Sequence, residues 1–120
     1  PVRVMITPYE KLVSPMYLSP LPGGSGAASR LLYSVGPTTM GNVICAPGSA
    51  TKTCQYVECF HLVEGVLFLT PKGGEAIRCV AGDTVVLPRG WTGDHDVVEK
   101  TTMLWLSVEE EDGDDDQSSN

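Results

Sequence analysis

The stretch "VECFHLVEGVLFLTPKGGEAIRCVAGDTVVLPRGW", residues 57–91, decides the fold. Short runs of β-branched, aromatic and aliphatic residues alternate in it with turn signals, which are Gly65, Gly73-Gly74, Gly82 and Pro88-Arg89-Gly90. Strands and turns at about ten-residue spacing predict a β-sandwich or a β-barrel. The connections are too short for parallel crossovers, which need roughly a dozen residues, so neighbouring strands should be antiparallel.

The same pattern continues on both sides of this stretch, and no segment has a helical period long enough to predict a helix. The predicted strands are 31–35, 40–46, 57–63, 66–70, 76–80, 84–87, 94–98 and 102–108. Residues 13–29 are rich in Pro, Gly and Ser, which predicts a loop that lies over the body as a lid or a wrapping arm. We therefore predict an all-β fold with an N-terminal arm and loop (1–30), a barrel (31–108) and a tail (109–120).

Length and composition point to one ordinary soluble domain. The chain has 120 residues, of which 42% are hydrophobic and 19% are charged, and this length suits a single core. No apolar run approaches the roughly 20 residues of a membrane helix. Residues 1–6 do not have the pattern of a secretory signal, so we expect a cytoplasmic location.

The net charge of −7 describes the tail. Seven of the 15 acids lie in the last twelve residues, which leaves eight acids against eight Lys and Arg in the body. Such a like-charged block predicts a disordered, solubilising end, with docking to a basic partner as the alternative. The neutral body has no basic stripe, so we expect no nucleic-acid partner. The segment "GGSGAASR" at 23–30 lacks the Gly-Lys-Ser/Thr ending of a phosphate-binding loop.

Four cysteines are spaced irregularly, at positions 45, 54, 59 and 79. This spacing matches neither paired C-x-x-C zinc sites nor the disulfide framework of a secreted domain. We predict reduced thiols that are mostly packed.

The spacing of the turns resembles the cupin superfamily, RmlC-like barrels of the double-sheet jelly-roll type. Glu58 is followed after six residues by Gly65, and Gly82 by Pro88 and Gly90, as in the two cupin motifs. The chain is similar above all to the subgroup of ureidoglycine aminohydrolase-like and ethanolamine-utilisation-type cupins. The segments that carry this likeness are Pro47-Gly48, "VEG" at 63–65 and "PRGWTG" at 88–93, and it covers about residues 39–108.

The resemblance implies a metal held by two or three histidines and a carboxylate, but this chain lacks the histidines. Residues 51–57 read "TKTCQYV" where the family has His-x-His, and Gly93 stands at the place of the third histidine. His95 lies two residues further along, and strand alternation places it on the same face as Gly93. We expect no cofactor; if a divalent transition metal were bound, its ligands would be Glu58, His95 and Cys54. For Cys54 an inert buried thiol is the simpler interpretation.

Glu58 is the strongest candidate for chemistry. A carboxylate within an apolar strand must be paired or must face a solvated cavity. Alternation puts Phe60 and Leu62 on its face and turns His61 to the other face, where it should pack. With His95, Glu58 would form an acid/base pair. The alternatives are a structural ion pair of Glu58 with Arg78, Arg30 or Lys52, and a purely lining role for His95.

The substrate would be a small organic molecule in the mouth of the barrel. The candidates for its wall are five apolar and aromatic residues: Tyr56, Phe60, Leu62, Trp91 and Trp105. Aromatic residues in a small barrel usually form the core, so only one or two of the aromatic candidates should touch a ligand. The leading hypothesis is a metal-independent enzyme of the isomerase, cyclase, dehydratase or decarboxylase class. The alternatives are a cupin with a depleted metal site and a non-catalytic binding protein. A homodimer formed through sheet edges and arms is also expected.

Overall fold

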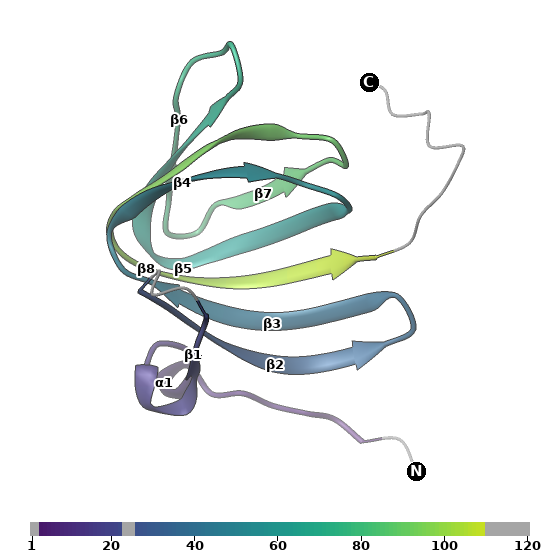
Figure 1. Cartoon of the computed structure of the whole chain (residues 1–120). Coiled ribbons are helices and arrows are strands. Elements are labelled where there is room, and N and C mark those ends of the chain that lie inside the picture. The colour runs from purple at the N-terminus through teal and green to yellow at the C-terminus, as the bar shows by residue number, and fades with distance from the viewer. Residues whose placement is uncertain (1–2, 23–25, 110–120) are drawn as a thin grey trace.

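The computed structural model describes residues 3–22 and 26–109, and they form an antiparallel jelly roll (Figure 1). A short helix α1 (Tyr9–Leu12) and a 3₁₀ turn η1 (Pro15–Tyr17) precede the strands. The strands are β1 (Ser19–Pro20), β2 (Ala27–Val35), β3 (Thr38–Cys45), β4 (Gly48–Thr53), β5 (Val57–Pro71), β6 (Ile77–Val80), β7 (Thr84–Leu87) and β8 (Thr92–Val108). No helix in these described ranges is long and apolar enough to cross a membrane.

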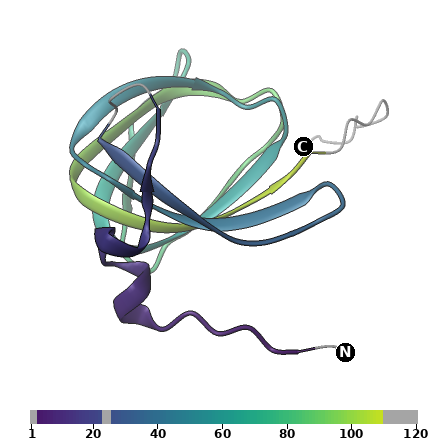
Figure 2. The ribbon, with the colours of Figure 1, turned by 60° about the horizontal axis from the view of Figure 1, so that its bottom comes forward.

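Two long strands, β5 and β8, run through both layers of the fold. The first half of β5 pairs with the second half of β8, from Val57 opposite Val108 to Leu62 opposite Met103. Their other halves also pair, to Pro71 opposite Gly93. One sheet therefore has the order β1-β2-β3-β8-β5-β7 and the other the order β4-β8-β5-β6. Figure 2 shows how the curved strands close around the interior.

Gly65 is the point at which β5 bends from one sheet into the other. Its φ of 107° lies in the left-handed region that favours glycine. A Cβ there would collide with the Thr101 hydroxyl, so the two backbones approach closely. The pairing with β8 shifts register around this point. The strands predicted at 57–63 and 66–70 are therefore one bent strand, and those predicted at 94–98 and 102–108 are likewise joined in β8.

The core lies between the two sheets. Its buried members come mainly from the inward rows of β5 and β8, where Leu62 and Leu67 are fully buried. The change of register at Gly65 moves the inward positions from even numbers before the bend to odd numbers after it, so Leu62 and Leu67 both face the core. This arrangement fixes which side chains of β5 can reach a cavity between the sheets.

The N-terminal arm folds onto its own barrel. The Asn42 side-chain amide on β3 donates a hydrogen bond of 2.9 Å to the Leu12 carbonyl at the end of α1, and Asn42 is fully buried. Strand β1 pairs with the start of β2, with Ser19 opposite Ser29. In Figures 1 and 2 the chain before α1 runs away from the barrel, and its side chains Val4 and Ile6 are 84% and 80% exposed.

Candidate functional site

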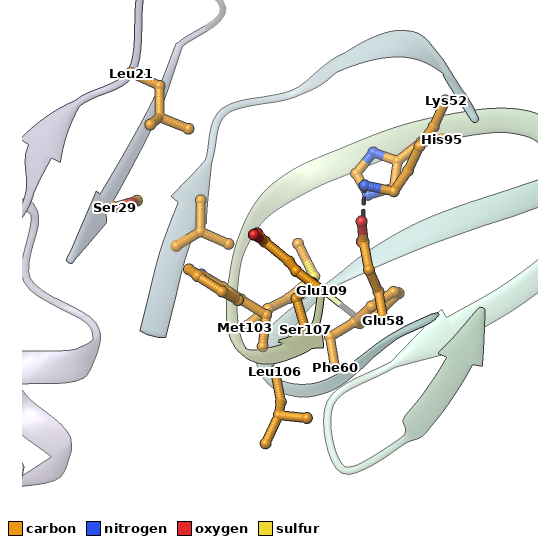
Figure 3. Close-up of a pocket in the computed structure, with 12 residues that line it drawn as sticks. Leu21, Ser29, Lys52, Glu58, Phe60, His95, Met103, Leu106, Ser107 and Glu109 are labelled. Atoms are coloured by element: carbon orange, nitrogen blue, oxygen red, sulfur yellow. Dashed lines mark ion pairs between the residues drawn. The ribbon is translucent and has the colours of Figure 1, made fainter. Parts of the chain in front are cut away.

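A cavity of about 380 Å³ opens between the two sheets (Figure 3). Side chains from both sheets line it, since β4 and the start of β8 contribute from one and β2, β3, β5 and the end of β8 from the other. The lining residues are Leu21, Ser29, Val43, Lys52, Glu58, Phe60, His95, Met103, Trp105, Leu106, Ser107 and Glu109. The size suits a small organic molecule.

An ion pair spans the polar end of this cavity. The Lys52 ammonium on β4 lies 2.9 Å from Oε1 of Glu58 on β5, and a dashed line marks this pair in Figure 3. The two side chains are 36% and 31% exposed, so both keep contact with the open space. Glu58 therefore has both features weighed from the sequence, an ion pair with Lys52 and a place on the cavity wall.

His95 reaches the same end of the cavity from β8. It pairs with Leu69 of β5 and Ala50 of β4 in the middle of its sheet. Burial lowers the pKa of the imidazole, and the nearby Lys52 ammonium lowers it further, while Asp96 and Glu58 act in the opposite direction. The ring is therefore neutral at neutral pH, and a neutral imidazole has one nitrogen that donates and one that accepts.

The rest of the wall is largely apolar. Phe60, Met103 and Val43 lie beside Trp105 on the inner face of the first sheet. The Trp105 ring packs on Gly41 of β3, where an added Cβ would come within 2.7 Å of the ring. Glycine at position 41 thus leaves room for this indole against the backbone of β3.

Three predicted wall residues do not line the cavity. Leu62 is buried in the core below it, and Trp91 packs against that core beside Gly93. Tyr56 lies in the turn between β4 and β5. Of the five predicted wall residues, Phe60 and Trp105 do line it.

Lys52 is a functional candidate that the structure adds. The sequence alone indicates it only as a possible ion-pair partner of Glu58. The sequence predicts no strand between 46 and 57, because Gly48–Thr53 has no alternation of apolar and polar residues. Its strand exists through pairing with β8, with Lys52 opposite Gly93. To predict that Lys52 faces Glu58, one would first have to predict strand β4 and its pairing with β8.

His61 lies outside the cavity. Its Nδ1 is 2.8 Å from the Thr84 hydroxyl on the adjacent strand β7. Strand alternation separates it from Glu58, which occupies the opposite face of β5. The only other histidine of the chain, His95, is therefore the one within reach of the cavity.

The donors named for a metal do not fit one. Cys54 is buried in the core, and burial and then Glu58 raise the pKa of its thiol, while Lys52 lowers it. Across residues 3–22 and 26–109, no three His, Cys, Asp or Glu side chains are grouped to hold an ion. The Lys52 ammonium lies 2.9 Å from one oxygen of the Glu58 carboxylate and would repel a second cation at that carboxylate.

Comparison with known proteins agrees with this architecture. The family model for the EutQ-like cupin domain matches residues 34–102. The search of curated proteins finds no match. Among solved structures, the EutQ protein of Clostridium difficile is 15% identical with a TM-score of 0.62, over 69% of this chain and 68% of that one.

Two further structures extend the likeness. A protein of unknown function from Rhizobium leguminosarum is 19% identical with a TM-score of 0.70, over 91% of this chain and 100% of that one. An RmlC-like cupin from Shewanella frigidimarina is 11% identical with a TM-score of 0.67, over 80% of this chain and 86% of that one. At these identities the structures show a shared fold and nothing about activity.

Proposed function

This chain belongs to the EutQ-like cupin domain family, and we propose that it is a small-molecule enzyme that moves protons in the cavity between its sheets. Glu58 and His95 are its acid/base groups, and the reaction belongs to the isomerase, cyclase, dehydratase or decarboxylase class. The observation that carries the proposal is that these two side chains come from opposite sheets and line one cavity with an apolar wall.

The two groups suit different tasks. Glu58, paired with an ammonium, is present as a carboxylate and can accept a proton from a bound molecule. The neutral His95 ring can donate a hydrogen bond or accept a proton at a second position of that molecule. Phe60 and Trp105 would hold the body of the substrate and limit water around the reacting atoms.

Proton transfer can be tested before the natural substrate is known. Mixtures of small ketones, hydroxy acids and oxo acids are incubated with the protein in D₂O, and loss of C–H signals is followed by proton NMR. We expect exchange of at least one compound to be accelerated by wild type and to fall at least about 100-fold in Glu58→Gln. His95→Gln should reduce it, and His61→Gln should not.

The same experiment separates catalysis from binding. A compound that binds in line-broadening measurements but whose C–H signals decay at the buffer rate would favour the non-catalytic small-molecule-binding alternative. Full exchange activity in Glu58→Gln would contradict the assignment of this residue.

A homodimer is proposed for the partner, with a second copy of the chain covering the arm. The side chains of Val4 and Ile6 in the arm are largely exposed, and those of Tyr33 and Val35 on β2 are about half exposed. In Figure 1 the arm is drawn below β2. Because both apolar surfaces belong to one chain, a two-fold pairing would cover both in each copy at once.

The four free cysteines favour a reducing compartment and hence the cytoplasm.

A further inference from the structure

We infer that Lys52 is a catalytic residue whose ammonium stabilises the negative charge that forms on a carbonyl oxygen when Glu58 removes a proton from the adjacent carbon. The substrates are then uncharged ketones or aldehydes with a C–H bond beside the carbonyl. This narrows the proposed reaction to the isomerase, cyclase or dehydratase class, because a decarboxylase acts on a carboxylate. This inference rests on the proposed function, because it needs Glu58 to act as the base.

The position of Lys52 supports this role. Its ammonium is held by β4 at the polar end of the cavity, across the interior from β5. The ion pair with Glu58 engages one oxygen, whereas an ammonium has three N–H donors. The side chain remains about one-third exposed on the cavity wall, so another donor can reach a ligand.

The charges balance through the step. The C–H bond breaks and its proton goes to a Glu58 oxygen. The electron pair of that bond forms a double bond between the two carbon atoms, and the π pair of the carbonyl moves onto its oxygen, which gives an enolate. Glu58 is then neutral, and the Lys52 charge that it had balanced faces the new oxyanion instead. The attraction of Lys52 to the substrate thus grows as the reaction proceeds, which is the condition for lowering a barrier.

The same charges select an uncharged substrate. In the free protein Glu58 already neutralises Lys52, and Glu109 adds another carboxylate to the cavity wall. His95 contributes no positive charge because burial and Lys52 keep its ring neutral. Among the described residues of the cavity wall, a substrate carboxylate would therefore meet two negative groups and no positive group without a negative partner. A ketone with an apolar body would meet Lys52, Phe60 and Trp105.

Binding of 4-nitrophenolate, a flat anion that resembles an enolate, tests the exchange of charge partners without turnover. Glu58→Gln imitates the protonated glutamate, so we expect it to bind the phenolate at least about tenfold more tightly than wild type, as read from visible absorbance. Adding Lys52→Met should remove that gain. Adding Lys72→Met, at the exposed β5–β6 turn, should keep it. Equal affinity of wild type and Glu58→Gln would overturn the inference.

Exchange kinetics then separate this inference from the proposed function. With an uncharged ketone that wild type exchanges in D₂O, Lys52→Met should lower kcat at least about 30-fold, and Lys52→Gln should retain the fold if the apolar variant does not. Loss of exchange in Glu58→Gln with full exchange in both Lys52 variants would overturn the inference alone. Exchange of oxo acids but of no uncharged carbonyl compound would overturn the substrate class. No exchange by wild type would overturn both proposals.

Discussion

Substitution of Gly41 by alanine should destabilise the barrel and disturb the cavity wall together. Gly41 pairs with Trp105 on one side and with Leu31 on the other. A Cβ at this position would lie 2.7 Å from the Trp105 ring and 2.5 Å from the Arg30 carbonyl oxygen. Trp105 lines the cavity and Arg30 belongs to the β2–β3 pairing, so movement of either group would disturb the cavity wall or that pairing.

The magnitude follows from two opposing effects. Overpacking of this kind costs about 1–3 kcal/mol. Replacing glycine also reduces the conformational freedom of the unfolded chain, which stabilises by about 0.4–1 kcal/mol where the native backbone is unstrained. We therefore expect a net loss of about 1–2 kcal/mol in the free energy of unfolding. In a domain of this size that lowers Tm by roughly 4–8 °C.

Urea and thermal unfolding measure the loss, and Trp fluorescence in a Trp91→Phe background reports on Trp105 alone. Gly74→Ala is the matched control, because the atoms nearest to its added Cβ belong to Pro71 and lie 3.5 Å away, an ordinary contact. We expect the control to change stability by less than about 0.5 kcal/mol. A Gly41→Ala protein as stable as the control, with unchanged Trp105 emission, would refute the close packing of ring on backbone.

Three further predictions concern pH, thiols and the arm. Burial lowers the pKa of His95 in the folded protein, so the unfolded chain binds this proton first as the pH falls below about 6.5, and the folded protein loses stability toward acid pH. The Tm of His95→Gln should therefore fall less between pH 7.5 and 5 than that of wild type. Iodoacetamide at pH 7.5 should label Cys59 before Cys79, because burial raises the pKa of the Cys79 thiol. Mass spectrometry measures the order of labelling, and earlier labelling of Cys79 would contradict the prediction. Deleting residues 1–8 should convert a dimer to a monomer in light scattering, and an unchanged mass would exclude the arm from the interface.

The architecture could be predicted because turns and alternation are local. Gly65, Gly82 and the Pro-x-Gly turn mark the ends and bends of strands whatever the rest of the chain does. Continuity across a bend could not be predicted, because β5 is paired on both sides of Gly65 with β8, which is far away in the sequence. Strand β4 was missed for the same reason: its six residues have no apolar face of their own and depend on β8.

In the candidate site, too, features local to one strand could be predicted, and features that depend on contacts between strands could not. Glu58 and His95 could be proposed from alternation within single strands, since each faces inward once its neighbours do. Which of the aromatic residues reach the cavity depends on packing between sheets. Trp105 does because Gly41 leaves room for its ring, whereas Trp91 lies over Gly93 beside the core.

Lys52 shows why contacts between the two sheets, which the sequence does not predict, matter for the mechanism. Read from one strand, Glu58 is an isolated carboxylate in an apolar run, and desolvation would dominate its chemistry. Read across the two sheets, it is half of an ion pair at 2.9 Å, and its ability to take a proton is coupled to what the ammonium does next. If the ammonium only neutralised Glu58, proton transfer would leave it without a negative partner, and this loss would slow the reaction. A gain in rate requires that Lys52 find a new negative partner as Glu58 loses its charge, and a carbonyl oxygen on the neighbouring carbon atom is the group that becomes negative at that moment.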